Sequence, residues 1–264
     1  VFRVGVQIVE GVAKAEAVGP AFAAVAECVL SGLLPKVEEG LAASAGRIPG
    51  SGFAVVAMGK LGGREMTASS DLDLVFVYDV PPGVESSDGA KPLPPTLYFA
   101  RLAQRLIAAL TTPTAAGALY EVDMRLRPTG NKGPVAVSLQ SFTEYHASQS
   151  WTWEHMALTR ARLIAGPPAL QAKVAANIRK RLTQLREASV IIADARDMRA
   201  RMAETFPGRN LWDLKYAPGG LVDIEFIAQS LQLIHAPALP EILDTNTVGS
   251  LEKLRDGGLL SVPD

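Results

Sequence analysis

The stretch MGKLGGREMTASSDLDLVFVYD, residues 58–79, decides the fold of this chain. Its glycines follow the apolar run FAVVAM (53–58), and its second half contains another apolar run, LDLVFVY (72–78). Runs of β-branched and aromatic residues separated by glycines are typical of strands. Asp71 and Asp73 lie at the second run, where buried carboxylates are costly unless a cation or a partner balances them. The stretch therefore predicts two strands with a ligand near the aspartates.

The spacing of the two aspartates indicates a metal site. Residues two apart on a strand point to one side, so Asp71 and Asp73 can approach one site while Leu72 and Leu74 enter the core. Oxygen ligands without histidine or cysteine favour Mg²⁺ or Mn²⁺ over zinc. A third carboxylate on a neighbouring strand would complete a site for two ions, the arrangement used for in-line displacement at phosphorus. Asp123 is our candidate for it.

The segment LYEVDMRLRP, residues 119–128, supplies the third strand. Its alternation predicts a charged face with Glu121, Asp123, Arg125 and Arg127 and an apolar face with Tyr120, Val122, Met124 and Leu126. The charged face is too polar to be core. We therefore expect Asp123 to join the other two aspartates, and Arg125 and Arg127 to offer planar guanidinium groups to phosphate.

The glycine segment GKLGG, residues 59–63, is expected to hold phosphate. It follows a strand and leads into a short predicted helix, where the backbone N–H groups of Gly59, Gly62 and Gly63 are unobstructed by side chains. Lys60 adds a point charge, and Ser70 is a further phosphate contact with a turn or cap role as its alternative. The G-x-x-x-x-G-K-[ST] motif is absent. A glycine loop alone is usually a tight turn, but its combination with Asp-Leu-Asp-Leu is more specific.

Helical spacing dominates elsewhere and predicts an α+β fold. A small mixed sheet with flanking helices in residues 1–165 is followed by a helical bundle in residues 166–264. Residues 80–95, rich in Pro, Gly and Ser, form an exposed connection. The predicted helices are two within residues 1–33 that break near Gly19-Pro20, then 96–111, 139–149, 151–163, 168–205 with a possible break, 221–235 and 246–257.

Composition narrows the class of protein. The 264 residues are 48% hydrophobic and 20% charged, which is typical of a globular chain. Lys plus Arg is 26 and Asp plus Glu is 27, so no basic excess attracts nucleic acid or a membrane surface. The single cysteine, Cys28, excludes an internal disulfide and a thiolate zinc cluster; we expect a buried thiol in a reducing cytoplasm.

The ends and the apolar runs suggest a fragment of a cytoplasmic protein. We find no signal-peptide layout and no apolar run of the ~18 residues that a membrane helix needs. The chain starts at Val1, inside a predicted helix and without methionine, so we expect an excised domain of a longer protein.

Longer motifs resemble a known family. GKLGGREMTASSDLDL resembles the glycine turn and D-h-D-h pattern (h, hydrophobic) of the nucleotidyltransferase superfamily of polymerase-β-like enzymes, with Lys60 where a Gly or Ser is usual. YEVDMRLRPTGNKGPVAVSLQSFTEYHASQSWTWEHMALTRARLIAG (120–166) and DLKYAPGGLVDIEFIAQ (213–229) resemble the bacterial glutamine synthetase adenylyltransferase/adenylyl-removing enzymes. Members of that family carry two homologous nucleotidyltransferase halves. One attaches AMP from ATP to a tyrosine of glutamine synthetase, and the other removes it by phosphorolysis as ADP.

The resemblance implies a nucleotidyltransferase fold and a chemistry. It implies that Asp71, Asp73 and Asp123 hold two Mg²⁺ ions, that ATP is the nucleotide substrate, and that glutamine synthetase is the protein substrate. It further implies regulation of the full-length enzyme by the PII signal protein. SWTWEHMALTRAR, and GGLVDIEF in place of a Gly-Gly-Ile-Arg-Glu sequence, are more similar to the transferring, C-terminal half.

Three alternatives stand beside protein adenylylation. They are the removing half, a catalytically idle module that binds nucleotide or a regulator, and nucleic-acid polymerisation, which the near-neutral charge disfavours. Other side chains have open roles at this stage. We expect Arg160 and Arg162 to contact phosphate or to pair with a Glu, and Trp151 and Trp153 to pack, with base stacking as the alternative. We expect Lys215, Asp223 and Glu225 to face the active-site cleft.

Overall fold

Two antiparallel strands form the centre of the sheet. The computed structural model describes residues 2–12, 14–115, 117–206 and 212–260. Strand β1 (Gly52–Ala57) pairs with β2 (Leu72–Asp79), with Gly52 opposite Asp79 and Ala57 opposite Leu74. Both strands and the glycine turn between them are confirmed, and the turn contains the short helix α3 (Gly59–Gly62).

Three further strands complete a mixed sheet of order β3-β2-β1-β5. On its free edge β2 pairs in parallel with β3 (Val122–Asp123) and then with β4 (Ala136–Ser138). On the other side β1 pairs antiparallel with β5 (Arg162–Ala165). Because β3 and β4 occupy successive parts of β2, residues 124–135 leave the sheet between them and contain the 3₁₀ turn η1 (Gly130–Lys132).

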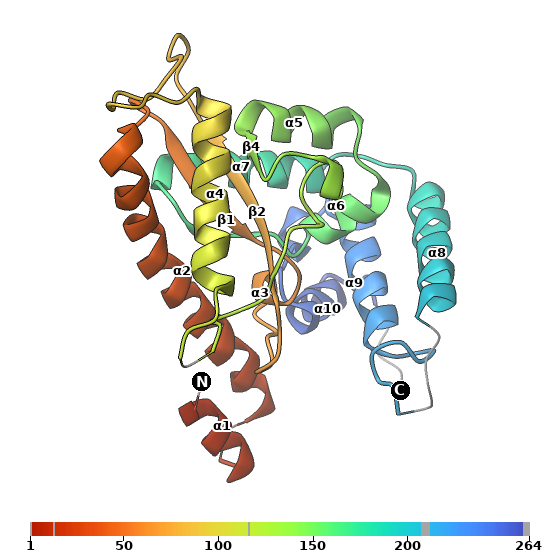
Figure 1. The fold of residues 1–264 in the computed structure, drawn as a ribbon. Helices are drawn as coiled ribbons and strands as arrows, with labels where there is room; N and C mark the ends of the chain where they lie inside the picture. The colour runs from red at the N-terminus through yellow and green to blue at the C-terminus, as the bar shows by residue number, and fades with distance from the viewer. Residues whose placement is uncertain (1, 13, 116, 207–211, 261–264) are drawn as a thin grey trace. The chain divides into compact units, whose positions relative to one another are not determined.

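Helices α2 (Ala15–Ala45) and α4 (Pro95–Thr111) lie beside each other against the sheet (Figure 1). Alternate residues of β1 and β2 face them, and the intervening residues of both strands are buried as well. This two-sided burial explains the continuous apolar runs of the two strands. The core on the α2 and α4 side includes Phe22, Leu30, Leu41, Phe53, Val55, Leu72, Leu74, Phe76, Leu102 and Leu106.

The beginning of the chain differs from expectation. Helix α1 (Phe2–Val9) and α2 are separate, but the break precedes Ala15, and Pro20 lies inside α2. A β-carbon on Gly19 would come 2.7 Å from the carbonyl oxygen of Arg64. Gly19 therefore marks the close approach of α2 to the loop after α3, and the predicted break at Gly19-Pro20 is wrong.

Two expectations about α2 also fail. Cys28 is exposed, because it lies on the solvent side of the helix between the buried Ala26 and Leu30. One segment, Glu16–Ala45, is long and apolar enough to cross a membrane, judged by length and composition only, whereas the sequence analysis expected no such run. Core helices of soluble proteins and signal sequences share this length and composition. The buried apolar residues of α2, such as Phe22, Leu30 and Leu41, belong to the core that α2 forms with the sheet.

The chain divides into two compact units. The first comprises Val1–Ser148 and Ala161–Asn177, and the second Gln149–Arg160 and Ile178–Asp264. The sequence analysis predicted a single domain boundary, after residue 165. In the structure the chain passes from one unit to the other more than once, and its last passage lies inside α7 (Pro168–Leu182). Besides the sheet, α2 and α4, the first unit holds α1, α3 and α5 (Leu139–Ser148).

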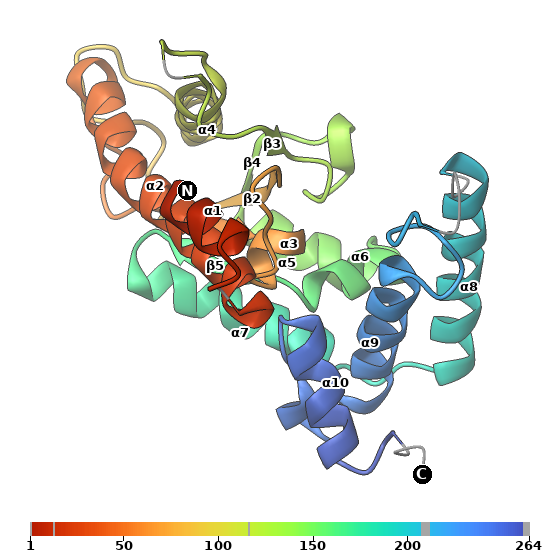
Figure 2. The same ribbon diagram turned by 90° about the horizontal axis from the view of Figure 1, so that it is seen from below.

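The second unit consists of helices joined by turns and loops, and its described residues include no strand (Figure 2). Its helix α6 (Thr152–Leu158) stops before residue 163, so the predicted helix over 151–163 is wrong in its second half. There Arg162–Ala165 form β5, because pairing with the edge of β1 outweighs local helical spacing. The break within 168–205 is confirmed. The elements are α6 (Thr152–Leu158), α8 (Ala188–Thr205), α9 (Leu221–His235), η2 (Pro240–Ile242) and α10 (Thr247–Asp256).

Candidate functional site

Two aspartates face each other across neighbouring strands of the first unit. Asp73 on β2 is the direct partner of Asp123 on β3, one step along from the pair Leu72 and Val122. Directly paired residues in a sheet point to the same face, so the two carboxylates lie on one side. Val122 packs against the core with Leu72, which confirms that the apolar side of this segment faces inward. The third strand thus meets the second where the sequence predicted.

Asp71 precedes the strand and is exposed. Among the described residues, no group of three or more His, Cys, Asp and Glu side chains is close enough to hold a metal ion. The structure therefore pairs Asp73 with Asp123 and leaves Asp71 at their margin. All three carboxylates still act on one cation, because Asp123 first, then Asp73 and Asp71, raise the pKa of the Arg125 guanidinium.

Arg125 neutralises Asp123. Its backbone N–H donates to Asp123 Oδ1 at 2.8 Å, and its Nε donates to Oδ2 at 2.7 Å. Its Nη2 also lies 2.5 Å from Oδ2. Burial raises the pKa of Asp123, but these hydrogen bonds and the charge of Arg125 outweigh it and leave the pKa below its ordinary value. The Arg125 side chain is 73% exposed, so solvent surrounds most of it.

The glycine turn packs directly on Asp73. A β-carbon on Gly59 would come 2.1 Å from Asp73 Oδ2, and Gly59 has a φ of 50°. Both facts require glycine. The N–H of Met58 donates to the carbonyl oxygen of Asp73 at 2.9 Å. The start of α3 is thus held against the carboxylate pair, with Lys60 half-buried beside Gly59.

The other end of the turn is anchored by a residue of β5. Arg162 donates to the carbonyl oxygens of Gly62 at 3.1 Å and Leu61 at 2.9 Å. Its Nη2 also pairs with Glu27 Oε1 on α2 at 2.6 Å. Gly62 and Gly63 are buried at this end. The ion-pair alternative for Arg162 is confirmed, but its partner lies 135 residues away, and no sequence pattern signals such a distance.

Two expected phosphate contacts have other roles. Arg127 is 8% exposed and donates to the carbonyl oxygens of Met124 at 2.6 Å and Gly133 at 3.4 Å. The chain turns after β3, so the predicted alternation does not extend to Arg127, and its guanidinium braces the loop. Ser70 is also buried, and its Oγ accepts from the N–H of Thr67 at 2.9 Å. The turn alternative therefore describes Ser70.

In the second unit, Asp223, Glu225 and Arg160 each belong to an ion pair within the unit. Arg160 Nη1 lies 3.1 Å from Glu225 Oε1. Arg199 hydrogen-bonds Asp223, and that bond chiefly lowers the pKa of Asp223. Asp223 lies at one end of an open apolar groove of about 830 Å³ between α8 and α9. Lys215 is exposed, with its Nζ 4.9 Å from the ring centroid of Tyr216.

These features define an α+β protein, as the sequence predicted, with a carboxylate pair beside a glycine turn on a small mixed sheet. The family profile described as glutamate-ammonia ligase adenylyltransferase matches residues 1–177, and this chain belongs to that family. A second profile, described as GlnD PII-uridylyltransferase, matches residues 193–264. The family resemblance found in the sequence is thereby confirmed.

Curated relatives agree with this assignment. The chain is 48% identical over 263 residues to a bifunctional glutamine synthetase adenylyltransferase/adenylyl-removing enzyme of Rhodopseudomonas palustris, covering 100% of this chain and 27% of the relative. Proteins of the same name in Bradyrhizobium diazoefficiens and Brucella suis are each 49% identical, over 98% and 86% of this chain and 26% and 23% of their own lengths. The chain thus spans about a quarter of the relatives it matches.

Proposed function

We propose that this chain is a nucleotidyltransferase module that transfers AMP from ATP to a tyrosine hydroxyl of glutamine synthetase and releases pyrophosphate. The observation that carries the proposal is the in-register pairing of Asp73 with Asp123 beside a glycine turn. The family and the printed names of the relatives support adenylyl transfer and the protein substrate.

The donor set of this site fits Mg²⁺. Asp73 and Asp123 are half-buried, offer only oxygen ligands, and lie next to a cation that already balances them. Mg²⁺ commonly binds through one or two carboxylates together with substrate phosphates. Asp73 and Asp123 would hold it, and Asp71, at the margin, would share a second ion. Such ions would supply charge neutralisation at the transferred phosphoryl group.

Side chains and backbone groups of this chain would orient the phosphates and accept the proton of the tyrosine hydroxyl. The start of the glycine turn and Lys60 orient the phosphates beside the carboxylates. Arg125, once it leaves Asp123, offers a planar guanidinium to phosphate. A tyrosine hydroxyl has a pKa near 10 and needs help to lose its proton. The freed Asp123 carboxylate accepts that proton through Oδ1 or Oδ2.

The direction of the reaction is part of the proposal. The motifs SWTWEHMALTRAR and GGLVDIEF support the transferring half. The removing half is the second candidate, because the printed name of the relatives contains both activities. The same carboxylates would then serve phosphorolysis of AMP-tyrosine to ADP. We propose also that the PII signal protein regulates the full-length enzyme in the cytoplasm.

An adenylylation assay tests the proposal. The chain is incubated with labelled ATP, Mg²⁺ and glutamine synthetase, and label on the synthetase is measured. We expect Asp73→Asn and Asp123→Asn each to lower the rate about a thousandfold, because metal ligation supplies several kcal/mol of transition-state stabilisation. The matched control is Asp79→Asn, at the other end of β2, where the carboxylate pairs with Lys173 at 2.6 Å.

The outcomes separate the candidates. Full activity of Asp123→Asn would refute the shared carboxylate site. Failure to label the synthetase, together with release of ADP from adenylylated synthetase and phosphate, would assign the chain to the removing half. Nucleotide binding without either reaction would indicate an idle module.

A further inference from the structure

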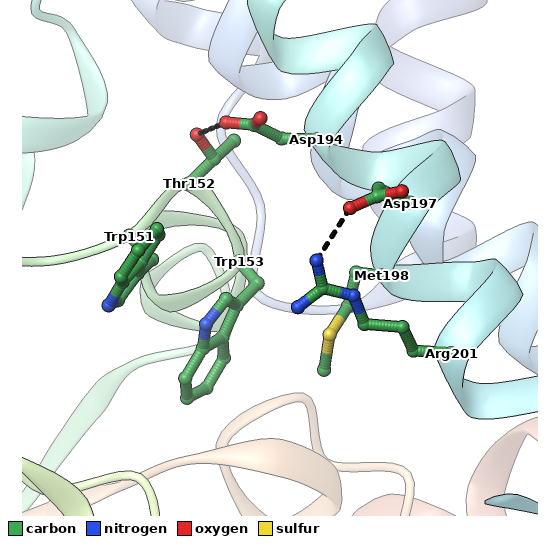
Figure 3. A pocket seen from close by; sticks show the side chains of 7 residues that line it. All are labelled: Trp151, Thr152, Trp153, Asp194, Asp197, Met198 and Arg201. Carbon is green, nitrogen blue, oxygen red and sulfur yellow. Dashed lines mark hydrogen bonds and ion pairs between the residues drawn. The ribbon is translucent and has the colours of Figure 1, made fainter.

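A pocket with two tryptophans and two aspartates lies within the second unit (Figure 3). Its volume is about 190 Å³. Sites for small-molecule ligands usually have ~300–1,000 Å³, so this one suits a single side chain better than a nucleotide. The beginning of α6 contributes Trp151, Thr152 and Trp153, and α8 contributes Asp194, Asp197, Met198 and Arg201.

The pocket is built on fixed elements. The carboxylate of Glu154, which is 6% exposed, accepts from the N–H of Trp151 at 2.8 Å and caps α6. The hydroxyl of Thr152 donates to Asp194 and ties the first turn of α6 to α8 (Figure 3). The two indole rings are therefore carried on a turn with a defined position. A preorganised surface loses less entropy when it binds.

The charges of the pocket leave one carboxylate without a cation. Asp197 pairs with Arg201 of the same helix at 2.8 Å. Asp194 receives a neutral hydroxyl, and within residues 2–12, 14–115, 117–206 and 212–260 no ion pair to it is found. The faces of Trp151 and Trp153 add further negative potential. The pocket as a whole therefore attracts a positive group.

The exposure of Trp151 points to a protein partner. Its side chain is 70% exposed, although the sequence suggested that it packs. Tryptophan is enriched at the centres of protein interfaces, where a partner covers it. A guanidinium suits this pocket particularly, because it stacks on an indole and pairs with a carboxylate in the same plane.

We propose that this Trp-Asp pocket (Trp151, Trp153, Asp194 and Asp197) binds an arginine side chain presented by a protein partner. The residues of this pocket belong to the second unit and differ from those of the carboxylate pair in the first unit, and binding of an arginine needs no nucleotide. Asp197 pairs with Arg201, so the charge of Asp194 leaves the pocket with a net negative charge that repels phosphate, and the chemistry of the ligand is opposite to that expected at the glycine turn.

The three tryptophans of the chain allow a direct test. We would label the indole nitrogens with ¹⁵N and titrate the 264-residue chain with the peptide acetyl-Gly-Arg-Gly-amide, recording the indole resonances by NMR. We expect the signals of Trp151 and Trp153 to shift, with a millimolar dissociation constant. The signal of Trp212, which is 87% exposed and lies outside the pocket, should stay in place.

Matched variants separate charge from stacking. Asp194→Asn keeps a partner for Thr152 but removes the charge, and Trp151→Ala removes an exposed ring. Each should weaken binding about threefold to tenfold, in the range of one cation–π or exposed ionic contact. Glu204→Gln, an exposed carboxylate on the same helix and outside the pocket, should leave binding unchanged.

Other outcomes would overturn the proposal. A citrulline peptide of the same size that gave equal shifts would show that charge is not recognised. Stronger shifts with adenosine would make the pocket a nucleobase site. The peptide concentration would be raised to about 20-fold above the expected dissociation constant of ~1 mM. If neither the Trp151 nor the Trp153 signal shifted there, the pocket would bind no such side chain.

Discussion

At the scale of single residues, the site depends on close approach. Asp73 Oδ2 lies where a β-carbon of residue 59 would be, and Gly59 has a left-handed φ. The sequence indicated a glycine here for access to phosphate, and the structure adds a steric requirement from the carboxylate itself. The same residue therefore shapes both the turn and the position of Asp73.

Replacement of Gly59 tests this close approach. Gly59→Ala should destabilise the first unit by about 2–4 kcal/mol, from the left-handed backbone and the overlap together. Gly83→Ala is the matched control, because Gly83 has a φ of 81° but nothing within 4 Å of a β-carbon. It should cost only about 1–2 kcal/mol. Denaturant unfolding measures both, and equal losses would contradict the steric argument.

At the scale of elements, β5 is the least predictable part of the sheet. Its residues followed a helical pattern, and only the open edge of β1 made them a strand. Arg162 at its start then connects three elements, because it contacts Glu27 on α2 and two carbonyl oxygens at the end of α3. These contacts of Arg162 fix the end of the glycine turn in position.

Loss of this junction should be costly. Arg162→Met leaves Glu27 and two buried carbonyl groups without their donor, so we expect a loss of about 2–3 kcal/mol in unfolding free energy. Combining it with Glu27→Gln in a double-mutant cycle should give a coupling of about 1–2 kcal/mol. The control is Arg64→Met. Arg64 is 57% exposed and 3.9 Å from Glu27, so its loss should cost under about 1 kcal/mol. Similar losses for both arginines would contradict the assigned role.

At the scale of the whole chain, the first unit and the family match end at the same residue. The unit closes with Ala161–Asn177, and the glutamate-ammonia ligase adenylyltransferase profile ends at 177. The unit needs this segment because β5 covers the edge of β1. The sheet therefore depends on residues that follow an excursion of the chain into the second unit.

Truncation tests this dependence. A fragment of residues 1–177 should unfold cooperatively and sediment as one species. A fragment of residues 1–148 lacks β5 and leaves the edge of a buried strand unpaired, so it should aggregate. Near-ultraviolet circular dichroism during heating and sedimentation velocity distinguish the two. Cooperative unfolding of the shorter fragment would show that β5 is dispensable.

The sequence by itself determined the central features of this protein. Continuous apolar runs specify β1 and β2, helical spacing specifies α4 and α9, and the motifs around Asp71 and Asp123 specify the family. These signals are local, because an apolar run or a helical spacing of apolar residues is a pattern of residues close together in the sequence. The pairing of Asp73 with Asp123 is not local, and it was expected from the charged face that the alternation of residues 119–128 predicted.

Only the tertiary structure decided the rest. Arg162–Ala165 form a strand, and Trp151 and Cys28 are exposed to solvent. The guanidinium of Arg127 hydrogen-bonds the loop that contains it, and Ser70 accepts a hydrogen bond within a turn. The strand at Arg162–Ala165 depends on a partner far away in the sequence, and the exposure of Trp151 and Cys28 depends on which side of an element faces the core. The contacts of Arg127 and Ser70 are close in sequence and depend on where the chain turns. The physical reason is that pairing and burial energies arise between elements, and no periodicity within one element contains them.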